Sequence, residues 1–178
     1  MSPYEIRIIG DPILRSVATP VSEIDGTVAK ICEDMLATMY EAPGVGLAAP
    51  QVGVQKRLFV YDIGDGPQVV VNPILAEGDG EWVFDEGCLS IPGLSWEIVR
   101  PREVHLTGCD LDGNEISIET DEYEARVFQH ELDHLDGVLL IEHLDDDQRK
   151  EANRILRQRE TLRESPSPTS AGGGIRLP

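Results

Sequence analysis

The most informative residues of this 178-residue chain are two histidines that stand four positions apart and bracket a glutamate, in His130-Glu131-Leu132-Asp133-His134. Because an α-helix has about 3.6 residues per turn, side chains four positions apart lie on one face. The two imidazoles can therefore hold one metal ion, with Glu131 close enough to reach a water on that ion. Two ordinary surface histidines are the weaker interpretation, because these are two of only four histidines and the surrounding helical pattern is apolar.

A catalytic metal needs a third protein ligand and an open position. The extended three-histidine protease pattern requires a histidine at position 140, where this chain has Leu140. A later glutamate such as Glu151 or Glu160 could serve, but both belong to a charged helix that we expect to face solvent. Cys88 is the better candidate, because a thiolate binds borderline divalent ions strongly. It stands in Glu86-Gly87-Cys88-Leu89-Ser90 between two expected strands, where the glycine permits a close backbone approach.

The other two cysteines fit a structural role. Cys32 falls on the apolar face of an expected helix and Cys109 within an expected strand, as small buried residues often do. Three cysteines form an odd set at no disulfide-scaffold spacing. With no signal-peptide pattern at its start and no apolar run approaching the ~20 residues of a membrane span, the sequence predicts a reduced, cytoplasmic protein without membrane contact.

A third segment, Gly44-Val45-Gly46-Leu47-Ala48-Ala49-Pro50-Gln51, formally matches a dinucleotide-binding fingerprint. We reject that interpretation, because the fingerprint should follow a strand and open a helix. Here the segment follows an expected helix, and Pro50 blocks a helical continuation. A glycine loop can instead bring backbone N–H groups and the Gln51 amide to a polarised carbonyl.

Charge is distributed unevenly along the chain. The net charge is −18, yet residues 149–178 carry seven basic and three acidic side chains. We expect the acidic body to repel nucleic acid, which argues against sequence-specific recognition, whereas the basic side chains between 149 and 163 could be attracted to phosphate. The alternative is a solvated helix face with ordinary charge pairs.

Apolar periodicity predicts three helices, at 28–41, 121–136 and about 145–163. Asp25 or Thr27 can cap the first, and the second should bury Tyr123 and Phe128 on one side. Short strands are expected at Glu5–Ile8, 58–63, 69–72, 82–84, 96–99, 104–111 and 115–119.

Strands that interleave with so few helices favour an α+β fold, with antiparallel and mixed short-strand sheets around a central metal-binding helix. We expect one catalytic domain over 1–164. Residues 165–178 are rich in serine, proline and glycine, which predicts a flexible tail.

Together, the segments at 44–51, 86–90 and 130–134 resemble the peptide deformylase family. That family carries a Gly-φ-Gly-φ-Ala-Ala-x-Gln stretch, a Glu-Gly-Cys-φ-Ser stretch and a His-Glu-φ-Asp-His stretch in this order. The resemblance runs from about residue 10 to residue 143 and does not cover the tail. It implies a hydrolase that removes the formyl group from formyl-methionine at the start of newly made polypeptides and releases formate.

The resemblance also implies roles for particular residues. Cys88, His130 and His134 match the family's metal ligands, with water as the fourth ligand, and Glu131 matches its general acid/base. Family members usually work with iron(II), often replaceable by nickel, cobalt or zinc. Because they act as chains leave the ribosome, the resemblance gives the basic segment 149–163 a reason to contact ribosomal RNA or protein.

The same resemblance implies a set of substrate contacts. Gln51 and the backbone N–H of Leu89 match the donors that stabilise the oxyanion. Gly46 matches a backbone partner of the substrate, Val45 borders the methionine pocket, and Gly87 lies in the segment expected to approach the substrate.

Four further polar residues are expected to support the site or the fold. Arg100 matches an arginine that pairs with the glutamate of the cysteine segment. By helix geometry Asp133 points away from the two histidines, which favours a cap or salt bridge, and we expect structural roles for His105 and His143.

Two other functions use the same residues. A metallopeptidase would cleave ordinary amides and take a carboxylate or histidine as its third ligand. A non-catalytic, metal-stabilised interaction module would close the ion with four protein ligands and use the basic helix for contact.

Overall fold

The computed structural model describes residues 4–164. The chain divides into two compact units, one ending at His143 and the other beginning at Leu144. The single domain expected over 1–164 stays a prediction, and the tail expected at 165–178 lies outside the described residues.

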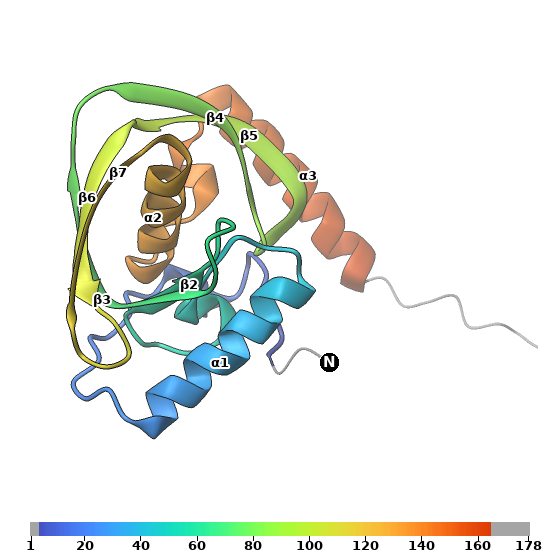
Figure 1. Ribbon diagram of the computed structural model, residues 1–178. Helices are drawn as coiled ribbons and strands as arrows, with labels where there is room; N and C mark the ends of the chain where they lie inside the picture. The colour runs from blue at the N-terminus through green and yellow to red at the C-terminus, as the bar shows by residue number, and fades with distance from the viewer. Residues whose placement is uncertain (1–3, 165–178) are drawn as a thin grey trace, which may run out of the picture. The chain divides into compact units, whose positions relative to one another are not determined.

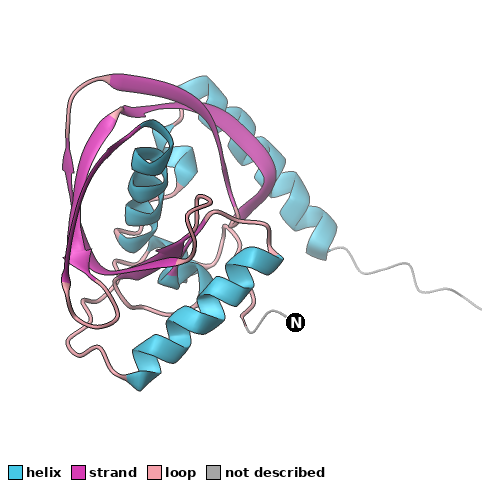
Figure 2. Cartoon of the chain, viewed as in Figure 1, coloured by secondary structure: helices cyan, strands magenta, loops and turns pink. Residues whose placement is uncertain are grey.

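The first unit contains two helices, seven strands and three short 3-10 turns in its described part (Figure 2). In chain order they are η1 (Pro12–Arg15), α1 (Gly26–Glu41), β1 (Gly46–Ala48), η2 (Ala49–Val52), β2 (Leu58–Tyr61), β3 (Gln68–Glu77), β4 (Glu81–Cys88), β5 (Ile91–Pro101), β6 (Glu103–Cys109), β7 (Glu115–Asp121), α2 (Glu122–Leu135) and η3 (Leu140–His143). The α+β class is confirmed.

One sheet has the strand order β1-β2-β3-β6-β7, and β4 and β5 form a separate two-stranded sheet. Neighbouring strands in both sheets pair antiparallel. Among the described residues, the parallel pairing expected for mixed sheets is confined to an isolated bridge between Thr19 and Lys56.

Helix α2 lies within the curve of the five-stranded sheet, and α1 packs on the opposite face (Figure 1). Strand β2 shows why both faces are apolar, since successive side chains point to opposite sides. Phe59 belongs to the core cluster around Phe128 of α2, whereas Val60 belongs to the cluster around Met35 of α1. Burial on both sides fixes α2, and with it the metal-binding motif, against the sheet.

Local signals set the ends of both helices. The Asp25 carboxylate accepts hydrogen bonds from the backbone N–H groups of Thr27 and Val28, so Asp25 is the cap of α1. Beyond α2, Gly137 has φ +73°, the left-handed conformation that glycine adopts most readily. A Cβ at Gly137 would also lie 2.8 Å from the backbone of Arg15, so this position admits no larger residue without rearrangement.

Strands β4 and β5 are longer than the sequence predicts, and they position the cysteine. Their register pairs Glu86 with Trp96 and Gly87 with Ser95, then shifts so that Cys88 pairs with Ile91. This irregularity falls at the glycine of the cysteine segment and places Cys88 at the end of β4.

Three local expectations are wrong. Residues 5–8 form no strand, although Arg7 N–H donates to the Gln51 carbonyl at 2.6 Å. Part of the loop expected at 44–51 is strand β1, which pairs with β2 through long-range contacts that local composition does not reveal. Tyr123 is 40% exposed rather than buried.

The second unit contains α3 (Asp146–Glu164), close to the helix expected at 145–163. The Asp145 carboxylate accepts from the backbone N–H groups of Asp147 and Gln148 at its start. Lys150 pairs with Asp147, and Arg154 pairs with Glu151. Within residues 4–164, no helix combines the length and apolar character that crossing a bilayer requires.

Candidate active site

A cavity of about 630 Å³ opens between the β1 segment, the β4–β5 sheet and α2. Eight of the nine residues that the sequence singles out for the site line it: Val45, Gly46, Gln51, Gly87, Cys88, Leu89, His130 and Glu131. The ninth, His134, contacts Cys88. Three segments that are distant in the sequence therefore meet at one place.

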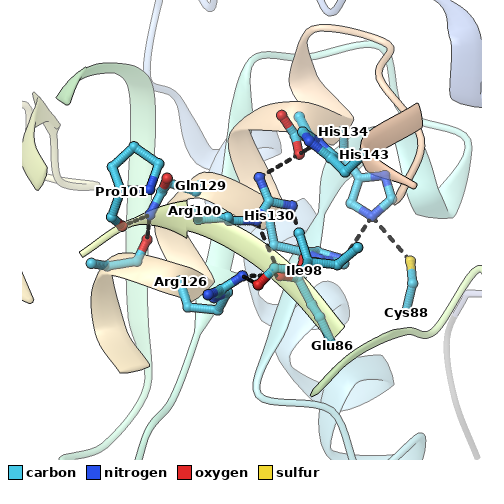
Figure 3. A network of polar contacts seen from close by, with 12 residues as sticks. Glu86, Cys88, Ile98, Arg100, Pro101, Arg126, Gln129, His130, His134 and His143 are labelled. Atoms are coloured by element: carbon cyan, nitrogen blue, oxygen red, sulfur yellow. Dashed lines mark hydrogen bonds and ion pairs between the residues drawn. The ribbon is translucent and has the colours of Figure 1, made fainter. Parts of the chain in front are cut away.

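Cys88, His130 and His134 form a compact donor set. Cys88 Sγ lies 3.2 Å from His134 Nε2, which lies 3.2 Å from His130 Nε2 (Figure 3). All three ligand atoms fall within 4.8 Å of one another. One sulfur and two imidazole nitrogens suit a divalent transition ion, and three protein ligands leave a coordination position for water or substrate. The residues present therefore fit a catalytic metal.

The cysteine is prepared to act as a ligand. Burial of the Cys88 thiol favours its neutral form, but the adjacent imidazoles of His134 and His130 outweigh burial and hold its pKa well below the usual value. The thiolate is the form that binds metals.

Glu86 fixes the orientation of the His130 ring through the nitrogen that is not in the donor set. Its carboxylate is 5% exposed and accepts a hydrogen bond from His130 Nδ1 at 2.6 Å. Because a carboxylate only accepts, Nδ1 carries the proton and Nε2 keeps the lone pair that faces the donor set. Burial opposes ionisation of Glu86, yet hydrogen bonds from His130 and Arg100 lower its pKa and keep it charged.

Two arginines hold Glu86. Arg100 donates from Nε at 3.0 Å and from a terminal nitrogen at 2.8 Å, the bidentate geometry that suits a carboxylate. Arg126 donates to Glu86 at 2.9 Å and also reaches the carbonyl oxygens of Ile98 and Trp82. The pairing of Arg100 with Glu86 is confirmed.

Glu131 presents a buried carboxyl to the cavity. It is 4% exposed, and its Oε2 atom finds no hydrogen-bond partner within the described part of the chain. Burial, the largest effect, raises its pKa to about 7, although the neighbouring histidines favour the charged form. A carboxyl with a pKa near neutrality can both accept and return a proton.

The Gln51 amide is held in one orientation. Its oxygen accepts from the Ala48 N–H at 2.9 Å, so its nitrogen must point the other way. That nitrogen donates to Ser90 Oγ at 3.1 Å and lies 3.8 Å from Cys88 Sγ. A donor is thereby aimed toward the metal-ligand set.

Asp133 and the remaining histidines lie outside the cavity lining. Asp133 forms a 2.8 Å salt bridge with Arg100, which confirms the expected ion pair, and a 2.7 Å contact with His143. His105 contacts Ser117 across β6 and β7 at 2.8 Å.

Several residues that line the cavity were not expected at the site from the sequence, among them Phe84, Tyr123 and Arg126. Arg126 left a usable signal, since it stands one helical turn before His130 and therefore shares the helix face of the metal-binding histidines. A charged residue at a buried position generally needs an opposite charge, here Glu86. Phe84 and Tyr123, whose ring centroids lie 5.8 Å apart, carry no sequence signal that distinguishes them from core residues.

Comparisons with known proteins agree with this geometry. The polypeptide deformylase family model matches residues 3–150. The peptide deformylase of Agathobacter rectalis is 51% identical over 137 residues, which cover 77% of this chain and 87% of that protein. The peptide deformylase of Acidothermus cellulolyticus is 43% identical over 175 residues, covering 95% of this chain and 97% of that protein.

Solved structures give the same result. The crystal structure of the Thermotoga maritima peptide deformylase has a TM-score of 0.78 at 47% identity, covering 80% of this chain and 97% of that chain. The structure of the Synechococcus elongatus enzyme in complex with actinonin has a TM-score of 0.84 at 38% identity, covering 90% of this chain and 87% of that chain. The chain therefore belongs to the polypeptide deformylase family, metal-dependent hydrolases that remove the N-formyl group from newly made polypeptides.

Proposed function

We propose that Cys88, His130 and His134 hold one divalent ion, iron(II) in the cell, and that the cavity receives the formyl-methionyl end of a polypeptide. Nickel, cobalt and zinc are the expected substitutes. The observation that carries the proposal is the convergence of these three donors beside a buried carboxyl, Glu131.

When bound, such an ion would lower the pKa of a water far below its bulk value, toward about 7, and polarise the formyl carbonyl. Glu131 takes the proton as the water oxygen attacks the formyl carbon, and later returns it to the amine that leaves. Its raised pKa of about 7 suits both transfers. The products are formate and a free amino terminus.

Negative charge that develops on the formyl oxygen needs donors in place before the reaction. We assign this role to Gln51 Nε2 and the backbone N–H of Leu89. The contact of Ala48 with the Gln51 oxygen supports the assignment, because it turns the nitrogen toward the ligand set.

The substrate chain is proposed to run beside β1. Because β1 is the end strand of its sheet, Gly46 can offer backbone groups to an extended peptide. Val45 borders the methionine side chain, and Gly87 permits close approach on the other side. A formyl group is small, so a narrow site admits it and excludes internal peptide bonds.

The basic helix supports a second, separable proposal. We place the protein in the cytoplasm, with α3 contacting the ribosome through its basic residues between 149 and 163. Deletion of residues 149–178 should abolish cosedimentation with ribosomes. Cosedimentation that survives the deletion would overturn this contact without affecting the catalytic proposal.

The direct test is formate release from formyl-Met peptides, measured anaerobically because iron(II) and thiolates oxidise. The wild-type chain should release formate and spare unformylated peptides, and Glu131→Ala should keep its metal yet lose nearly all turnover. Cleavage of unformylated peptides would favour a metallopeptidase. A metal closed by four protein ligands, without turnover, would favour an interaction module.

A further inference from the structure

A chain of short polar contacts links the ligand His130 to His143 in η3 (Figure 3). From His130 Nδ1 it runs 2.6 Å to Glu86, then 2.8 Å to Arg100. Arg100 continues 2.8 Å to Asp133, whose same oxygen lies 2.7 Å from His143 Nε2. The far end of this chain lies outside the cavity lining.

Arg100 divides its donors between two carboxylates. Nε and one terminal nitrogen serve Glu86, while the other terminal nitrogen serves Asp133. Because Arg100 and Glu86 are each 5% exposed, water screens their charges weakly. Any change in how Asp133 holds Arg100 is therefore transmitted to Glu86.

The charges around Glu86 also indicate that Asp133 influences the position of the Glu86 carboxylate. Arg126 brings a second guanidinium to Glu86, so two cations face that one carboxylate. Asp133 supplies the second negative charge, which makes the four-residue group neutral. Without it, Glu86 would be drawn toward the two cations and away from His130.

We propose that Asp133 and His143 are positioning residues of the metal centre. His143 holds Asp133, Asp133 holds Arg100, and Arg100 leaves Glu86 directed at His130 Nδ1. The ligand atom Nε2 is thereby aimed at the ion, and the ring keeps its basicity. This inference rests on the proposed metal site.

The test uses Co²⁺ as the probe, titrated into the metal-free full-length chain against a competing chelator, with visible spectra of the bound ion. Asp133→Asn keeps the shape of the side chain and removes its charge, and should weaken Co²⁺ binding about tenfold or more, as loss of an outer partner does. His143→Phe removes the donor and should weaken binding in the same direction. His143→Gln restores a donor and should restore the affinity.

Two matched controls separate this role from general stability. Asp136 pairs with Arg57 at 2.6 Å from the end of the same helix, and His105 contacts a serine rather than this group. Asp136→Asn and His105→Phe should keep the wild-type affinity and spectrum. The positioning variants should shift the cobalt absorption bands and lower kcat while leaving KM unchanged.

Two results would overturn the inference. One is wild-type Co²⁺ affinity and spectra in both Asp133→Asn and His143→Phe. The other is an equal loss in the control variants. If Asp133→Asn fails to fold, the Co²⁺ affinities of His143→Phe and His143→Gln test the inference on their own. Cobalt binding needs no turnover, so a chain that shows this affinity pattern but releases no formate would overturn the proposed function and leave this inference standing.

Discussion

The carboxyl of Glu131 occupies the space that a side chain at position 46 would need. A Cβ on Gly46 would lie 2.9 Å from Glu131 Cδ, closer than real side chains approach. The glycine of the β1 segment is thus required by the general acid/base proposed on α2. Two segments separated by more than eighty residues constrain each other at the point where we propose that the proton is transferred.

Gly46→Ala should therefore displace the Glu131 carboxyl and lower kcat for formate release by about a hundredfold, the effect of a misplacement near 1 Å. Gly26→Ala is the matched control, because a Cβ there meets nothing within 4 Å. Equal kcat in the two variants would contradict the close approach.

Gln51→Leu should remove one of the two proposed oxyanion donors and keep a side chain of similar size. We expect kcat to fall by about 10²–10³-fold, as when one such donor is lost elsewhere, with little change in KM. Steady-state kinetics on a formyl-Met peptide provide the measurement. A rise in KM at constant kcat would show that Gln51 binds the substrate uniformly and has no special role in the transition state.

Arg100→Met should leave the buried Glu86 carboxylate with one cation instead of two. Breaking a buried pair costs about 3–5 kcal/mol, and the free energy of unfolding in urea should fall accordingly. Arg102→Met is the control, since the Arg102–Glu122 pair is nearly half exposed on both sides. There the loss should stay below about 1 kcal/mol. Similar losses in both variants would contradict the buried network.

Cys32 predicts a pH dependence of stability. Burial raises the pKa of its thiol from 9.0 to about 11, so the folded state holds a proton that the unfolded state releases. The contribution of the neutral, buried thiol to the free energy of unfolding is complete below pH 9 and is lost as the pH rises through 11. At ~1.4 kcal/mol per pKa unit, the loss is about 3 kcal/mol. Cys32→Ala should flatten the decline of unfolding free energy over this range, and an unchanged slope would refute the assignment.

The catalytic motif could be predicted from sequence because helical spacing alone brings His130 and His134 together. Cys88 followed from residue type, since its glycine and serine neighbours fit a buried apolar role poorly. The cavity-lining aromatics could not be predicted. Periodicity separates the two faces of a helix, but it does not tell whether the apolar face meets a core or a cavity, and Tyr123 meets the cavity.

Strand β1 illustrates a second limit. Its three residues pair with β2 in a register that depends on distant contacts, so local glycine and proline content predicts only a loop. The double hold of Arg100 on Glu86 and Asp133 is equally non-local, because it joins β5, β4 and α2.

The most direct measurement is X-ray absorption at the metal edge of the zinc-loaded protein. We expect one sulfur at about 2.3 Å and two imidazole nitrogens at about 2.0–2.1 Å, with a light-atom ligand completing four-coordination. Cys88→Ser should remove the sulfur scatterer and leave the nitrogens. A zinc shell without sulfur in the wild-type chain would rule out Cys88 as a metal ligand.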